Sequence, residues 1–186
     1  GLYLGDYYVK EISPSVGYLA DETEHDLVCN YEGDLVAEVK RDCTSLEQVM
    51  KQPFQIIKAA NNGKTDADLL KGAGFTAYLE SSLTKKADGN YEFASATPVV
   101  IGENGATEMF TDEKGYACSI ALPYGTYIVR ETTTPHNYTP VDDFTVRITE
   151  NNPNQPQTWR VLLDDEFEAK LKIIKQDDET KKPVLQ

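Results

Sequence analysis

A short run of small, aromatic and β-branched residues that ends in a glutamate occurs twice in the chain. The first copy reads Gly5-Asp-Tyr-Tyr-Val-Lys-Glu11 and the second reads Gly125-Thr-Tyr-Ile-Val-Arg-Glu131. Each glutamate is followed at the same distance by a tyrosine, Tyr18 in the first copy and Tyr138 in the second. An internal repeat constrains the fold more than any other feature of this sequence, because both copies must build the same structural unit.

A second pair of matching segments gives nearly the same period. Phe54-Gln-Ile-Ile-Lys58 resembles Leu171-Lys-Ile-Ile-Lys175, so the lysines are 117 positions apart and the glutamates 120. A unit of this length is an ordinary size for one hydrophobic core. We therefore predict a complete repeat at 53–168. The C-terminal part of a preceding repeat with its junction would occupy 1–52, and the first strand of a following repeat would occupy 169–186, as in an excerpt of a tandem array.

The composition indicates an all-β fold. The chain has 11 tyrosines and many valines, isoleucines and threonines, and polar turn sequences such as Asn61-Asn-Gly63 separate the apolar runs. Short strands at this spacing favour an antiparallel β-sandwich. The expected strands are 6–12, 35–41, 54–59, 74–79, 97–101, 117–121, 125–132, 144–149, 158–163 and 169–176, and 45–50 is either a helical turn or part of the junction.

Charge excludes some classes of partner. The chain carries 18 basic and 31 acidic residues, a net charge of −13, which disfavours binding to nucleic acid or to an anionic membrane surface. No apolar run approaches the length of a membrane span. The composition fits a soluble extracellular rod.

Cysteine and histidine usage predicts neither a metal site nor a cofactor. The sequence has no CxxC or HExxH motif, which disfavours a structural zinc. Cys29, Cys43 and Cys118 are too few for a disulfide framework. Cys29 and Cys43 could pair, or the three could be small buried apolar residues. Trp159, the only tryptophan, is expected to pack in the core or at an interface, with a sugar-stacking platform as the alternative.

Five segments in order resemble the Cna B-type, or SpaA-type, prealbumin-like repeat domain of Gram-positive adhesins and pilins. They are Ile56-Ile-Lys58, Leu70-Lys-Gly-Ala-Gly-Phe75, Thr111-Asp-Glu-Lys-Gly115, Tyr124-Gly-Thr-Tyr-Ile-Val-Arg-Glu131-Thr132 and Val161-Leu-Leu-Asp164. The resemblance covers 53–175, and by the repeat also 1–20. It implies a prealbumin-like β-sandwich in a cell-wall-anchored extracellular protein.

The resemblance also implies a self-formed isopeptide bond between the first and last strands. Lys58 would be the nucleophile, Asp164 the acceptor and Glu131 the proton shuttle, with Asp165 as the second choice of acceptor. Burial favours the neutral forms of amine and carboxylic acid, and contact between them supplies much of the rate. The alternative is a buried ion pair or triad without a covalent bond.

The flanking repeats would use equivalent residues. Glu11 would serve the preceding repeat and Lys175 the following one. The position in the preceding repeat that corresponds to Asp164 falls at Glu47, so that repeat either uses Asp42 or lacks a standard acceptor.

The expected function is a structural stalk without enzymatic turnover, with neighbouring repeats as its partners. The alternative is a module that binds a host matrix protein or glycan without a crosslink, through the segment 79–100.

Overall fold

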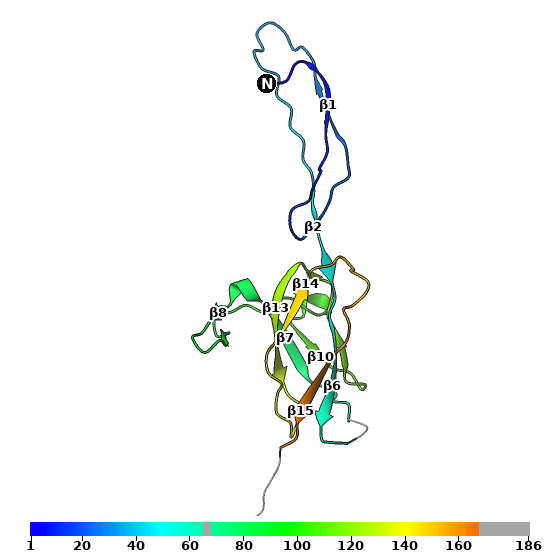
Figure 1. Cartoon of the computed structure of the whole chain (residues 1–186), viewed down its shortest axis with the longest axis vertical. Coiled ribbons are helices and arrows are strands. Elements are labelled where there is room, and N and C mark those ends of the chain that lie inside the picture. The colour runs from blue at the N-terminus through cyan, green and yellow to red at the C-terminus, as the bar shows by residue number, and fades with distance from the viewer. Residues whose placement is uncertain (65–67, 168–186) are drawn as a thin grey trace, which may run out of the picture.

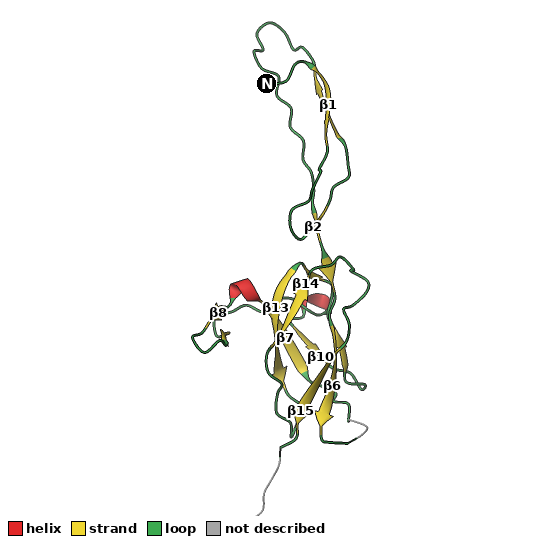
Figure 2. Ribbon diagram, viewed as in Figure 1, coloured by secondary structure: helices red, strands yellow, loops and turns green. Residues whose placement is uncertain are grey.

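The computed structural model describes residues 1–64 and 68–167, and two β-sheets form the body of the molecule (Figures 1 and 2). The larger sheet has the order β10-β7-β13-β14 and the smaller one the order β11-β6-β15. The larger comprises β7 (Gly74–Leu79), β10 (Glu108–Phe110), β13 (Gly125–Thr133) and β14 (Phe144–Ile148). The smaller comprises β6 (Gln55–Asn61), β11 (Tyr116–Cys118) and β15 (Arg160–Asp165).

Shorter elements complete the chain. Two 3-10 helices are η1 (Glu80–Ser82) and η2 (Glu103–Gly105). The short strands pair as β8 with β9, β12 with β5 and β2 with β4. Their bounds are Tyr18–Leu19 for β2, Gln48–Val49 for β4, Lys51–Gln52 for β5, Thr84–Lys85 for β8, Tyr91–Glu92 for β9 and Leu122–Pro123 for β12.

The core lies between the two sheets and follows the alternation of each strand. Phe75 and Ala77 of β7 point inward together with Tyr127 and Val129 of β13, and all four are buried. Ile56 of β6 meets them from the smaller sheet. Two sheets with this core between them confirm the β-sandwich expected from the sequence.

One strand pair departs from the antiparallel expectation. β15 runs parallel to β6, with Leu162 opposite Lys58 and Asp164 opposite Ala60. Parallel neighbours cannot be joined by a tight turn, so the chain between them must build the rest of the sandwich. The first and last strands of the domain are consequently side by side.

The outer face of β13 is covered as well. Ile128 is buried, although it points away from Tyr127 and Val129. Phe93, on the arm that carries β8 and β9, packs edge-on against Tyr78 at 4.9 Å between ring centroids. The guanidinium of Arg130 lies 3.8 Å from the centroid of the same Phe93 ring. The arm in 79–100 is therefore anchored to the sheet by an aromatic and cationic stack.

The N-terminal segment forms a separate β-ribbon beyond one end of the sandwich (Figure 1). β1 (Gly5–Val9) pairs with β3 (His25–Cys29) through five residue pairs. β13 pairs with β14 through five residue pairs as well, over the matching stretch Gly125–Val129. The ribbon thus repeats the pairing of β13 and β14, but Gly17 is the only buried residue of 1–50.

Seven of the expected strands correspond to β1, β6, β7, β11, β13, β14 and β15. The predictions of strands at 35–41 and 97–101 are wrong. In 97–101 the amides of Val99 and Ile101 donate isolated hydrogen bonds to the carbonyls of Ala77 and Ala106, and no strand forms. The segment 45–50 contains β4, so a helical turn there is wrong, and its alternative as part of the junction stays a prediction. The strands β2, β3, β5, β8, β9, β10 and β12 were not anticipated. The expected strand at 169–176 lies outside the described residues.

Gly115 positions the strand that carries Lys58. Its φ is +64°, and a Cβ there would lie 2.3 Å from the carbonyl oxygen of Lys58. Its own carbonyl accepts the Lys58 amide at 2.7 Å. We expect Gly115→Ala to lower the free energy of unfolding by roughly 2–3 kcal/mol, through backbone strain and the clash together.

Gly105→Ala is the matched control, because Gly105 has a φ of +80° and a Cβ at this position would meet no atom within 4 Å. It should cost about 1 kcal/mol through strain alone. Urea unfolding of both variants measures the difference. Equal losses would contradict the proposed clash with the strand of Lys58.

Candidate functional site

Three charged side chains that are far apart in the sequence meet in the interior of the sandwich. Lys58 comes from β6, Glu131 from β13 and Asp164 from β15, and all three side chains are buried. Each occupies an inward position beside an apolar inward residue of its own strand, Ile56 on β6, Val129 on β13 and Leu162 on β15. Strand alternation therefore directs polar groups into a region where water cannot compensate their charge.

The lysine amine bridges the two carboxyl groups. Lys58 Nζ donates to Glu131 Oε2 at 2.7 Å and also contacts Asp164 Oδ1. The amide of Val141 donates to the same Glu131 oxygen at 3.1 Å. Phe75 supplies an apolar wall, with its ring centroid 5.7 Å from Nζ. The amine is thus held in contact with an acceptor carboxyl on the neighbouring strand.

Two oxygens of the cluster are not satisfied. Glu131 Oε1 and Asp164 Oδ2 are buried and have no hydrogen-bond partner in the part of the chain that the structure describes. One cation facing two carboxylates would also leave one uncompensated negative charge in the core. Both features disfavour the fully ionised cluster and favour either a bound proton or a covalent bond.

The buried environment makes the Asp164 carboxyl a weaker acid. Burial raises the pKa of the Asp164 carboxyl from 3.8 to about 6, against the opposing effect of the Lys58 ammonium, and the neighbouring Glu131 raises it further. The group that the sequence suggested as electrophile is therefore protonated more readily than an ordinary aspartate.

Asp165, the second choice of acceptor, lies on the other face of β15. It is exposed and accepts a hydrogen bond from Asn61 Nδ2 at 2.7 Å. The geometry brings Asp164 to Lys58 and leaves Asp165 outside the core.

Glu11 occupies the place in the N-terminal ribbon that Glu131 has in the sandwich. Its Oε2 accepts the amide of Asp21, ten residues further along, at 2.6 Å. Glu131 Oε2 accepts the amide of Val141, also ten residues further along. The two glutamates thus share a local hydrogen bond in addition to their sequence context. Lys175 lies outside the described residues, and Asp42 and Glu47 are exposed.

The remaining candidates differ in part from expectation. All three cysteines are free; Cys43 is exposed and the other two are half-buried, so they are not the buried small residues anticipated. Trp159 is 54% exposed, so its expected place in the core is wrong, whereas packing at an interface stays a prediction. Among residues 1–64 and 68–167, no group of acidic, histidine or cysteine side chains could hold a metal ion. No helix within those same ranges is long and apolar enough to span a bilayer.

Sequence reasoning missed two contributors to the site. The first is the Val141 amide, which fixes the Glu131 carboxyl and lies in a loop without a recognisable motif. The second is the Phe75 ring beside the amine. The phenylalanine was visible as the end of Leu70-Lys-Gly-Ala-Gly-Phe75, but its contact with Lys58 depends on the pairing of the sheets.

Comparison with known proteins places the sandwich in a family. Residues 53–160 match the model of the SpaA prealbumin-like fold domain. The TIE protein of Bacillus anthracis is 27% identical, with a TM-score of 0.52 over 87% of this chain, which spans 25% of that protein. GBS52, the minor pilin of Streptococcus agalactiae, is 15% identical, with a TM-score of 0.50 over 94% of this chain and 65% of that one.

No curated protein sequence matches the chain. The family match covers more than half of the 186 residues and includes all the buried residues of the hydrophobic core, which run from Phe54 to Ile148. The chain belongs to the SpaA family of prealbumin-like fold domains.

Proposed function

We propose that this chain is a stalk segment of an extracellular, cell-wall-anchored surface protein, stiffened by an isopeptide bond between Lys58 and Asp164. The observation that carries the proposal is the buried contact between the Lys58 amine and a carboxyl on the parallel neighbouring strand. A bond there would tie the first strand of the domain to the last. A pulling force along the chain would then load a covalent link as well as hydrogen bonds.

The reaction needs only the three residues of the cluster. Neutral Lys58 Nζ attacks Asp164 Cγ, a carbon–nitrogen bond forms, and one carbon–oxygen bond breaks. Glu131 delivers a proton to the departing oxygen, which leaves as water, and takes up a proton from the nitrogen. The contact of Glu131 Oε2 with Nζ at 2.7 Å suits this exchange. The protein reacts once, without turnover.

The same proposal extends to the N-terminal ribbon. Residues 1–52 would be the C-terminal part of a preceding repeat and 53–168 a complete one, with 169–186 beginning the next. The ribbon supports this assignment because it carries the β13–β14 pairing and the glutamate contact of the complete domain. Its exposed apolar side chains, among them Tyr8, Val9 and Ile12, would be covered by the rest of that repeat.

Removal of the proton shuttle should abolish the bond but leave the fold. In Glu131→Gln the amide oxygen can still accept the Val141 amide, and Lys58 keeps Asp164 as its partner. Loss of a crosslink that closes a loop of this length costs about 4–5 kcal/mol, so we expect the melting temperature to fall by about 15 °C.

Calorimetry measures the shift, and peptide mapping shows whether Lys58 and Asp164 remain joined. Glu108→Gln is the matched control, since Glu108 accepts the hydroxyls of Thr132 and Thr133 of β13 and lies on β10, at the edge of the same sheet. It should melt close to the parent protein. A Glu131→Gln variant that melts with the parent would refute a stabilising bond.

The rate of bond formation should depend on pH through Asp164. Above a pKa of about 6 the cluster loses a proton and carries a net negative charge. Below it the cluster is neutral overall, and internal proton transfer can produce the amine and the two acids that react. We expect the rate to fall about tenfold for each pH unit above 6.

Chains recovered unfolded from inclusion bodies and refolded between pH 5 and 8 allow this rate to be followed by mass spectrometry. Asp164→Asn is the control, because an amide acceptor does not titrate and its bond forms with loss of ammonia. Its rate should be independent of pH over this range. A parent rate that is equally flat would contradict the role given to the Asp164 proton.

A further inference from the structure

The ribbon and the sandwich are joined by one segment, 48–52, whose strands β4 and β5 pair with the ribbon and with the sandwich in turn (Figure 1). At its centre, the amide of Met50 donates to the Gly17 carbonyl of the ribbon at 2.8 Å. The Met50 carbonyl accepts the amide of Tyr124 of the sandwich, also at 2.8 Å. One residue is therefore bonded to both units, and the backbone itself couples them.

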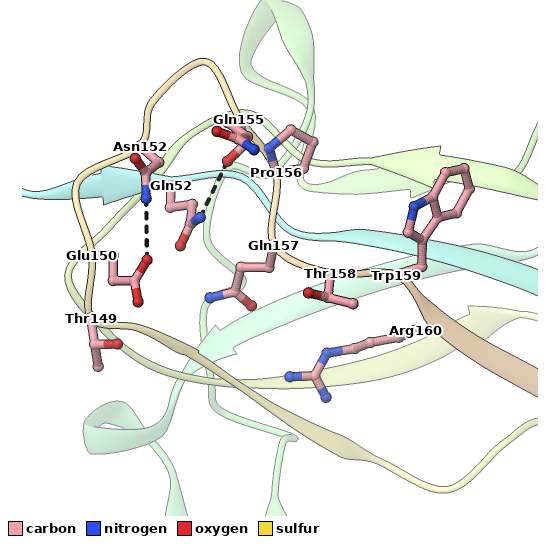
Figure 3. Close-up of a pocket in the computed structure, with 10 residues that line it drawn as sticks. All are labelled: Gln52, Thr149, Glu150, Asn152, Gln155, Pro156, Gln157, Thr158, Trp159 and Arg160. Atoms are coloured by element: carbon pink, nitrogen blue, oxygen red, sulfur yellow. Dashed lines mark hydrogen bonds between the residues drawn. The ribbon is translucent and has the colours of Figure 1, made fainter.

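The loop between β14 and β15 holds the next residues of this joint on the sandwich. The Lys51 amide donates to Asn151 Oδ1 at 3.0 Å, and the Lys51 carbonyl accepts the amide of Asn152 at 2.9 Å. Figure 3 shows the side chain of Gln52 beside the same loop, where its Nε2 donates to the Gln155 carbonyl at 3.2 Å. The chain thus enters the sandwich in one fixed direction.

The side-chain contact of the joint is the packing of Tyr124 against Gly17. Gly17 is the only buried residue of 1–50, and a Cβ on it would lie 2.5 Å from Cδ1 of the Tyr124 ring. The ring therefore fits against the ribbon only because Gly17 has no side chain.

The ribbon half of this joint recurs at the other end of the sandwich. Asn137 lies 120 residues after Gly17, and their φ angles are +73° and +89°. The Asn137 carbonyl accepts the amide of Phe167 at 2.9 Å, and Phe167 lies 117 residues after Met50. These are the two shifts that relate the repeated motifs of the sequence. Gly17 is buried under the sandwich, whereas Asn137 and Phe167 are exposed.

The neighbouring residue pairs follow the same correspondence. Tyr18 lies opposite Val49 in the pairing of β2 with β4, and Tyr138 lies opposite Glu166 in an isolated bridge. The same turn and the same short pairing are therefore present at both ends of the sandwich, covered at one end and exposed at the other.

We propose that Asn137 and Phe167 form the docking surface for a further prealbumin-like domain that follows in the same polypeptide. The docked element would be the turn before the long strand of that domain, the counterpart of Pro123–Gly125. Its central amide would donate to the Phe167 carbonyl, and consecutive domains would be held at a fixed angle. This inference rests on the array of repeats in the proposed function and names the surface through which they meet, but it does not require the isopeptide bond.

The side chain of Asn137 determines which partner fits. Gly17 admits the ring of Tyr124, whereas the Cβ of Asn137 would occupy the space of such a ring. The partner must therefore carry a less bulky residue at this position. Leucine is such a residue, and Leu4 holds the place of Tyr124 in the ribbon.

A chain in which residues 1–167 are followed by a second copy of 51–186 tests the surface, because it adds a complete core and keeps the existing joint as a reference. In the first version the second copy carries Tyr124→Leu. In the second version Tyr124 is unchanged. In the third version Tyr124 is unchanged and the first copy carries Asn137→Gly.

Residual dipolar couplings of the backbone amides show whether the two sandwiches align as one body. We expect a single alignment tensor to fit both sandwiches in the first and third versions. In the second version, where Asn137 faces a tyrosine, domain motion should reduce the couplings of one sandwich at least roughly twofold. Asn104→Gly is the matched control for Asn137→Gly, because Asn104 also has a positive φ, +55°, but lies on η2. It should leave the second version mobile.

The inference is overturned if the first or the third version needs two tensors, or if the second version fits one, with or without Asn104→Gly. Peptide mapping of the same samples shows separately whether Lys58 and Asp164 are joined in each copy. Unjoined residues with a single tensor would refute the proposed bond alone, and joined residues with two tensors would refute the docking surface alone.

Discussion

The contact between a buried lysine and two buried carboxyl groups governs the rest of this structure. Lys58 cannot lie in the core without Glu131 and Asp164, since an unpaired charge there would cost several kcal/mol. Lys58 and Asp164 meet because β15 pairs in parallel with β6, and β13 brings Glu131 to them from the facing sheet. Burial raises the free energy of the charged forms of these side chains. It therefore favours the neutral amine and the neutral carboxylic acids, which are the forms that react.

The N-terminal ribbon shares two local features with the complete sandwich but has no core of its own. The five-pair ladder of β1 and β3 and the hydrogen bond from Asp21 to Glu11 match those of β13, β14 and Glu131. The ribbon nevertheless has almost no buried residue of its own. Local sequence therefore specifies the strand pairing, whereas a core requires the strands that face it.

Sequence patterns predicted those features that depend on a single strand. The alternation in 74–79 and the run 125–132 identified β7 and β13, and the family motifs identified Lys58, Glu131 and Asp164 before their contact was known. The strand β3 was missed, although shifting β14 by the repeat period would have located it. The exposure of Trp159 and the parallel partner of β15 could not be predicted, because both depend on how distant segments pack. A tryptophan in sequence alone gives no sign of which side of an edge strand it will face.

The central claim is that the Lys58–Asp164 contact becomes a covalent bond, and the intact mass of the fully denatured chain tests it most directly. The account predicts a mass lower than that of the sequence by one water, and a Lys58→Ala variant with no deficit. A parent chain with the full mass of its sequence would contradict the account and leave Lys58, Glu131 and Asp164 as a buried ion-pair cluster in a non-covalent sandwich.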